Sequence, residues 1–236
     1  MCGTCLEDFN NNTINSSSTN YFRKKVGKST EEIIKSCLSN TINKCKNGGS
    51  IVIEIPTNNY SQINITSAKY LIECGFQGVY LSFQRPFKNI SSIFKNNGID
   101  TNKLIFMDLA TQCTDEKSND NYECVDESMT LNIENICKTV NSYIEKLNSS
   151  NIFILIDSLN TLALYKSPED IIQLADTLSQ NIKNKSKKVF ILFNVADDLC
   201  QKDFIKEITV QSDETINVVK YIEKYTDDVI HPGLLT

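Results

Sequence analysis

Ile152-Phe153-Ile154-Leu155-Ile156-Asp157-Ser158 is the stretch of sequence that decides the fold. Its five consecutive apolar residues predict a strand that is buried on both faces, as the central strands of parallel sheets are. Two polar residues, Asp157 and Ser158, follow at once. Because ligands bind outside the carboxyl ends of parallel strands, the sequence predicts that these two residues lie at a ligand crevice.

Apolar runs and helical stripes alternate along the rest of the chain. Further strands are predicted at 51–55, 78–83, 104–108, 189–195 and 215–219. Helices are predicted at about 30–45, 64–74, 88–97, 128–147, 168–182 and 198–208. This alternation is typical of an α/β fold with a parallel sheet sandwiched by helices, in a single domain.

The two ends of the chain differ in composition from its middle. Residues 1–28 are polar and rich in Asn and Ser, which predicts a flexible leader. The α/β domain is expected over 29–225, with a tail over 226–236. Inside the domain, the acidic segment 109–127 is expected to be a long loop.

Charge and hydropathy exclude several classes of partner. The net charge of −5 and the pI near 5.1 argue against nucleic acid, which would require a basic face. No apolar run reaches the ~18–20 residues that span a bilayer, and no secretory h-region is found at the N-terminus. We therefore expect a cytoplasmic protein whose nine cysteines are reduced.

Asp157 has the position of an acid that holds Mg²⁺ on bound phosphates in nucleotide-hydrolysing proteins. Such an acid works with a Gly-rich loop ending in Lys-Ser or Lys-Thr, between an earlier strand and its helix. Here the segment after the strand at 51–55 is Pro-Thr-Asn-Asn-Tyr-Ser-Gln-Ile (56–63), without Gly or Lys. Gly27-Lys28-Ser29 is no substitute, because Phe22 stands where the first glycine is needed. The sequence therefore predicts that the phosphate cradle is absent.

Five stretches, taken in order over roughly residues 30–220, resemble the RecA-like ATPases and most closely their archaeal KaiC-like branch. They are Gly78–Phe83, Asn97–Asp108, Ile156–Leu162 with the Walker B-like Asp157-Ser158, Ser167–Asp170, and Lys188–Asn194. A family of archaeal domains without a P-loop, often attached to signalling modules, is similar too. The resemblance implies a RecA-like fold with an ATP and Mg²⁺ site at Asp157 and Ser158.

Two departures from this family decide the functional hypothesis. The family's phosphate loop corresponds to 56–63, and the acidic residues that activate its attacking water correspond to Gln84-Arg85, which cannot act as a general base. We therefore expect a non-catalytic domain, not an enzyme and without a cofactor. It would act in regulation or scaffolding through a protein partner, as a monomer or small homo-oligomer.

The charged residues at the predicted crevice have alternative roles. Arg85 and Lys88 flank Pro86 at the crevice and either bind an anion or form a solvated charge pair. If one of them replaces the missing lysine, the chain is an ATP-binding protein with an unusual phosphate loop. Asp157 is either such a site's Mg²⁺ ligand or a strand-end acid that accepts hydrogen bonds from neighbouring amides.

A third hypothesis is a metal- or thiol-binding module built on Cys2 and Cys5. A zinc site needs two further ligands besides this pair, and the only histidine, His231, lies in the predicted tail. We expect the pair to be incidental. Deleting residues 1–20 should then leave the melting temperature unchanged and remove no metal. Stoichiometric zinc or iron in the purified protein, lost on that deletion, would contradict this expectation.

Overall fold

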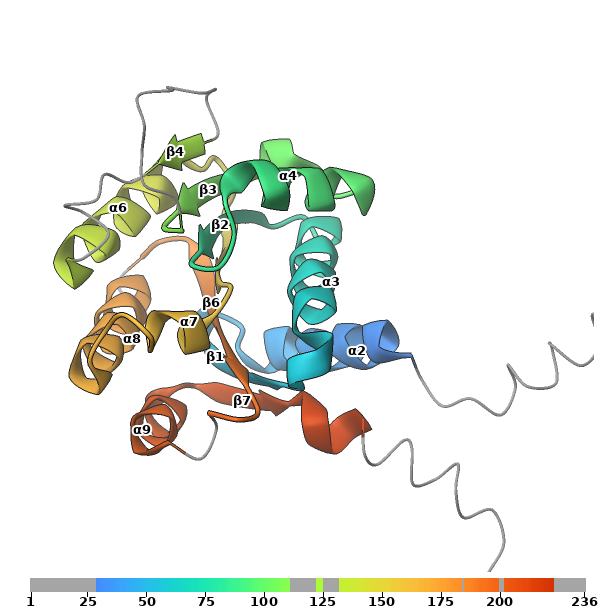
Figure 1. Ribbon diagram of the computed structural model, residues 1–236. Coiled ribbons are helices and arrows are strands. Elements are labelled where there is room, and N and C mark those ends of the chain that lie inside the picture. Colours follow the sequence, from blue (N-terminus) through green and yellow to red (C-terminus); the bar gives the residue numbers. More distant parts are fainter. Residues whose placement is uncertain (1–28, 111–121, 125–131, 184, 200–201, 223–236) are drawn as a thin grey trace, which may run out of the picture.

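The computed structural model describes residues 29–110, 122–124, 132–183, 185–199 and 202–222. The predicted leader, the predicted tail, Cys2 and Cys5 lie outside these residues, as does most of the acidic segment. Within them the chain forms a seven-stranded sheet in the order β4-β3-β2-β5-β6-β1-β7, with every neighbouring pair parallel (Figure 1). The strands are β1 (Gly48–Ile55), β2 (Gln77–Ser82), β3 (Leu104–Asp108), β4 (Tyr122–Cys124), β5 (Asn151–Ile156), β6 (Lys188–Ala196) and β7 (Glu214–Asn217).

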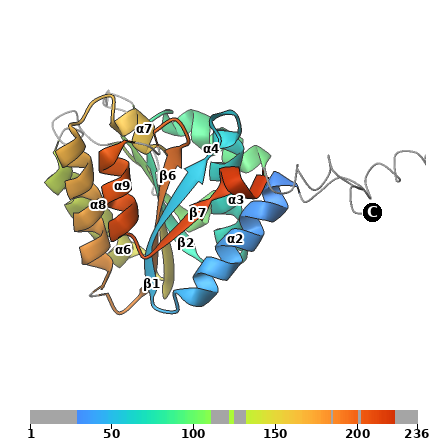
Figure 2. The ribbon, with the colours of Figure 1, turned by 90° about the horizontal axis from the view of Figure 1, so that it is seen from below.

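Helices cover both faces of the sheet, as Figure 2 shows. One face packs against α2 (Thr30–Lys44), α3 (Tyr60–Glu73) and α4 (Phe87–Asn96). The other packs against α6 (Ile133–Lys146), α8 (Pro168–Lys183) and α9 (Asp203–Gln211). Shorter helices are η1 (Thr57–Asn59), η2 (Thr101–Lys103) and α7 (Leu159–Leu162), and residues 218–222 after β7 are helical as well. The predicted α/β fold with a sandwiched parallel sheet is confirmed.

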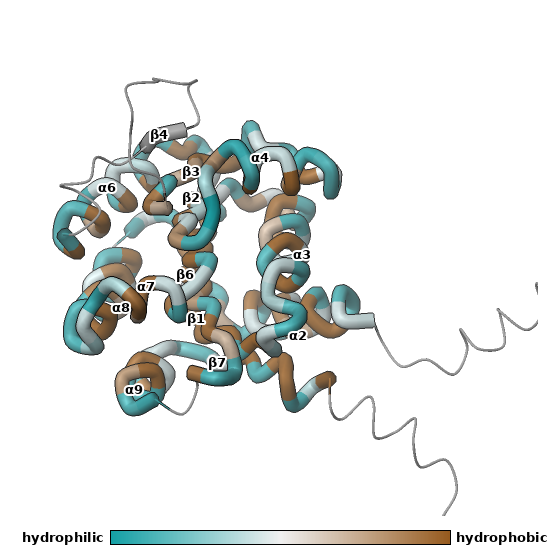
Figure 3. Tube along the Cα trace, viewed as in Figure 1, coloured by the Kyte–Doolittle hydropathy of each residue, from teal (hydrophilic) through white to brown (hydrophobic). Residues whose placement is uncertain are grey.

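Apolar packing on both faces explains why these segments form this sheet. Residues Ile152 to Ile156 of β5 are fully buried, with alternate side chains in the two cores. The helices present an apolar stripe inward and hydrophilic residues outward, which Figure 3 shows clearly for α8. At the start of α2, Ser29 and Glu32 form the expected capping box.

The strand order opens a crevice at the carboxyl ends of the central strands. From β1 the chain continues to α3 on one face, whereas from the neighbouring β6 it continues to α9 on the other. The same divergence separates β2, which continues to α4, from β5, which continues to α8. Where neighbouring strands send their connections to opposite faces, a ligand site can form between them.

The structure corrects two details of the prediction. The acidic segment 109–127 is not loop throughout, because β4 pairs with β3 from Phe106 to Asp108. The segment after β1 is not an eight-residue loop, because η1 follows Pro56 and α3 begins at Tyr60. The chain therefore turns into helical structure directly after Pro56.

Gly78 is required by the ring of Phe153, its partner across β2 and β5. A Cβ built at Gly78 would lie 2.3 Å from Cζ of Phe153, far inside contact distance. We expect Gly78→Ala to lower the free energy of unfolding by about 1–3 kcal/mol, the usual cost of overpacking a core. Urea denaturation measures this change.

Phe153→Leu provides the matched background for this test. If the clash with the ring causes the loss, Gly78→Ala should cost clearly less in the Phe153→Leu protein than in the unmutated one. An equal cost in both backgrounds would show that another contact is responsible.

Candidate functional site

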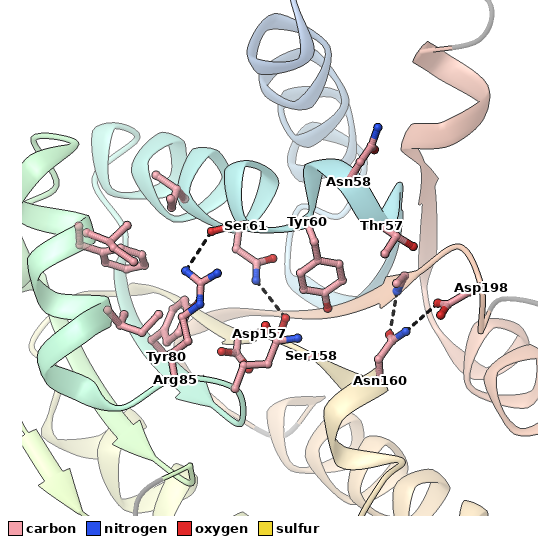
Figure 4. A pocket seen from close by; sticks show the side chains of 17 residues that line it. Thr57, Asn58, Tyr60, Ser61, Tyr80, Arg85, Asp157, Ser158, Asn160 and Asp198 are labelled. Carbon is pink, nitrogen blue, oxygen red and sulfur yellow. Dashed lines mark hydrogen bonds between the residues drawn. The ribbon is translucent and has the colours of Figure 1, made fainter.

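A cavity of about 370 Å³ occupies the crevice at the carboxyl ends of β1, β2, β5 and β6 (Figure 4). Three of the residues predicted from the sequence line it, namely Asp157, Ser158 and Arg85. Lys88, exposed in the first turn of α4, does not. Of the two cations proposed from the sequence, Arg85 therefore lies at this cavity and Lys88 does not line it.

Asp157 is buried and faces the connection from β2 to α4. Its Oδ1 accepts a hydrogen bond from the backbone N–H of Phe83 at 2.9 Å, and its Oδ2 lies 3.0 Å from Oγ of Ser82. Burial raises the pKa of the Asp157 carboxyl to about 6, although the Phe83 N–H and the Ser82 hydroxyl act in the opposite direction. Both carboxyl oxygens are thus used inside the protein.

Protonation of Asp157 would complete this hydrogen-bond network. The Ser82 hydroxyl has one hydrogen but two acceptors within reach, Oδ2 of Asp157 at 3.0 Å and the carbonyl oxygen of Arg85 at 2.7 Å, so it can donate to only one of them at a time. A neutral Asp157 can then donate its own hydrogen to Ser82 while Oδ1 still accepts from Phe83. The network therefore suits a neutral carboxyl at least as well as a charged one.

A second buried acid, Asp108 at the end of β3, holds the other end of the same connection. Its Oδ2 accepts from the backbone N–H of Phe87 at 2.8 Å, and its Oδ1 accepts from Ala110 N–H at 3.0 Å. Phe87 is the first residue of α4, whose N-cap, Pro86, makes no side-chain cap. Asp108, which belongs to β3, thus accepts the hydrogen bond that an N-cap side chain would normally accept at the start of α4. The sequence analysis did not identify this role, although an acid ending an apolar run was its signal.

Ser158 serves as the N-cap of α7. Its buried Oγ accepts from Thr161 N–H at 3.0 Å and lies 3.0 Å from the Thr161 hydroxyl. A serine hydroxyl at this position of a helix normally satisfies the first free amides. The short helix and its cap were not predicted.

Two buried asparagines that the sequence analysis missed lie at the cavity, where Asn64 is part of the lining and Asn194 bonds to it from behind. Asn64 of α3 donates from Nδ2 to the carbonyl oxygen of Asp157 at 3.0 Å and accepts from the amide of Asn194 on β6. The Tyr60 hydroxyl donates to the Asn194 carbonyl oxygen at 2.9 Å. Asn194 stood out in the sequence as the single polar residue inside the apolar run of its strand. These bonds join α3, β5 and β6 below the cavity.

Opposite ends of the cavity differ in charge. At one end, Arg85 is half-buried and donates from Nη1 to Oγ of Ser61 at 3.2 Å. At the other end, Asp198 accepts from Nδ2 of Asn160 at 2.9 Å. Figure 4 shows Arg85 beside Tyr80, with Asp198 on the far side of Tyr60.

The described residues contain no group of three or more His, Cys, Asp or Glu side chains that could hold a metal ion. In this part of the chain, Cys37, Cys45, Cys74 and Cys137 form no disulfide. In the same ranges, no helix has the length and apolar character that crossing a membrane requires.

Comparison with known proteins gives likenesses of structure only. No family model matches the chain, and no curated protein does. Among solved structures, it is similar to the uncharacterized protein PH0321 from Pyrococcus horikoshii in complex with an unknown peptide. The identity is 14%, with 77% of this chain and 82% of that chain covered and a TM-score of 0.58. A KaiC-like protein, PH0186 from Pyrococcus horikoshii OT3, matches at 16% identity over 69% of this chain and 70% of that chain, with a TM-score of 0.49. Likeness at such identity concerns the fold alone.

The raised pKa of Asp157 predicts a specific pH dependence. Its folded-state pKa of about 6 lies above the ~3.9 of an unfolded chain, so the folded protein holds the proton more tightly. The stability that this gives is complete below about pH 4 and is lost as the pH rises through 6. Relative to Asp157→Asn, the unmutated protein should lose on the order of 2 kcal/mol between these pH values.

Urea unfolding of both proteins at pH 4, 5, 6 and 7 measures this difference. Asn keeps one oxygen for Phe83 and an N–H for Ser82, so we expect Asp157→Asn to fold normally. Asp157→Ala is the control, because it leaves those groups without partners and should cost roughly 1–3 kcal/mol across the range. Parallel pH profiles for the unmutated and Asn proteins would show that Asp157 is not the titrating group.

Proposed function

We propose that this chain is a non-catalytic RecA/KaiC-like domain that acts in regulation or scaffolding through protein partners. One observation carries the proposal: the groups that would hold Mg²⁺ and phosphate are used within the protein. Asp157 is bound to Ser82 and Phe83, and Ser158 caps α7. The segment between β1 and α3 is a helical turn without glycine or lysine.

The charge of the cavity also supports the absence of a nucleotide cofactor. Among the described residues that line it, Arg85 alone carries a positive charge, whereas Asp157 and Asp198 are acidic. A nucleoside triphosphate is normally held by backbone amides, a lysine and a metal ion together. One guanidinium cannot replace all of these contacts.

A second line of support, for a protein partner, comes from the turn after α7. Leu164 and Tyr165 are 76% and 73% exposed, unusually high values for large apolar side chains. Their backbone is fixed, because Leu164 N–H donates to Thr161 O and Tyr165 N–H donates to Leu162 O. We propose that these two adjacent side chains contact the partner, where they would be removed from water.

The remaining parts of the proposal concern the partner and its setting. The PH0321 structure holds an unknown peptide, and we propose a peptide or protein as the class of partner for this chain too. The four cysteines of the described part that form no disulfide support a cytoplasmic location. We propose a monomer or small homo-oligomer, since the nucleotide that joins subunits in many RecA-like rings would be missing.

The alternative, an ATP-binding protein with an unusual phosphate loop, is favoured by one observation. Arg85 lines the cavity, and a guanidinium is a group that pairs with phosphate. Lys88 does not line the cavity and is the weaker candidate. The third hypothesis, a module using Cys2 and Cys5, concerns residues outside the described ranges and stays a prediction.

Calorimetric titration with Mg-ATP tests the proposal. We expect no binding with a dissociation constant below about 1 mM, which corresponds to only about −4 kcal/mol. Arg85→Gln and Lys88→Gln should give the same result as the unmutated protein. Micromolar affinity that is lost in Arg85→Gln would contradict the proposal and support the ATP-binding alternative.

A further inference from the structure

We propose that the cavity binds a carboxylate that carries a single negative charge and an apolar body, with the carboxylate on Arg85. The inference rests on the proposed function, because it assigns to the crevice a ligand other than a nucleotide. The carboxylate could belong to the C-terminus of a partner protein or to a free small molecule.

The first argument is the incomplete bonding of Arg85. A guanidinium has five N–H donors, and in the described part of the chain the Arg85 side chain bonds only to Ser61. No carboxylate of these residues lies within ion-pair distance of it. A half-buried cation at the wall of a cavity is stabilised by an anion that enters the cavity.

The second argument is the apolar wall beside this cation. The apolar part of the lining comes from the elements that flank Arg85 and its partner Ser61, namely Ile65 of α3, Tyr80 of β2, and Ile90, Ile93 and Phe94 of α4. The Tyr80 and Phe94 rings meet edge to face, with centroids 5.1 Å apart, so this wall is rigid. An apolar group placed against it leaves water while its anionic end stays at Arg85.

The third argument limits the charge of the ligand. Asp198 lies at the far end of the cavity, and the neighbouring Asp197 accepts from the Thr57 hydroxyl at 2.6 Å. A polyphosphate extending from Arg85 would bring its outer charges toward these acids. A carboxylate keeps its charge at the guanidinium, whose planar fork matches it in a bidentate pair.

Ser61 completes the recognition of the anion. It is the second residue of α3, a 14-residue helix whose positive end lies at the cavity. Its hydroxyl holds Arg85 in place and has a hydrogen to donate to a bound carboxylate oxygen. Arg85, Ser61 and the apolar wall therefore define one site with an anionic and an apolar end.

Ligand-observed NMR and calorimetry with 4-phenylbutyrate and its neutral amide test the site. We expect the acid to bind with a dissociation constant of about 1 mM or tighter, as ligand efficiency allows for its size, and the amide at least tenfold more weakly. Arg85→Gln should weaken binding of the acid at least tenfold. Lys95→Gln, which removes a charge from the last turn of α4, should leave it unchanged.

Ile93→Ala provides a second variant in case Arg85→Gln unfolds. It shortens the apolar wall, so it should weaken phenylbutyrate binding several-fold. A peptide ending in Leu with a free carboxylate, compared with its amidated form, then distinguishes the two sources. Tighter binding of the free peptide than of phenylbutyrate supports a partner's C-terminus, and the reverse order supports a small molecule.

Three results would overturn the inference: no binding of either acid, equal binding of acids and amides, or tighter binding of inorganic phosphate than of phenylbutyrate. None of these three results bears on the proposed function, which is tested by the Mg-ATP titration and would be contradicted by micromolar affinity. The two proposals can therefore fail separately.

Discussion

The buried carboxyl of Asp157 holds the connection that follows β2, and the shape of the crevice depends on this contact. Through Ser82 and Phe83 it fixes the first residues of the connection, while Asp108 fixes the start of α4 at Phe87. Arg85 lies between these two attachments. Its side chain therefore reaches the cavity from a backbone that is bound on both sides, by acids at the ends of two different strands.

The fold was largely predictable because its strongest signals are local. The apolar run before Asp157 is long enough to be buried on both faces, and the helices that follow carry clear stripes. The elements that the sequence did not predict depend on tertiary contacts. Tyr122–Cys124 becomes a strand because β3 offers an unpaired edge, and α3 starts early because nothing in 56–59 opposes a helical turn.

The sequence indicated where the candidate site lies, but not which hydrogen bonds its residues make. Asp157, Ser158 and Arg85 line the cavity because parallel strands end together. The partners of Asp157 and Arg85 are distant in sequence, as Ser82 and Phe83 are from Asp157, so no local pattern reports them. The same limit applies to Asn64 and Asn194, whose pairing joins a helix to a strand 130 positions away.

The bonding of Asp157 and the helical turn after β1 belong to the same end of the sheet and have to be considered together. An acid at the end of a buried strand must be neutralised by a cation or satisfied by donors. In a metal site Mg²⁺ and its waters meet that need. Here the Ser82 hydroxyl and the Phe83 amide meet it, and the raised pKa shows that a proton can contribute as well. Placing a Gly-rich loop after β1 would therefore not create a metal site by itself, because the carboxyl would first have to give up the hydrogen bonds that shape the crevice.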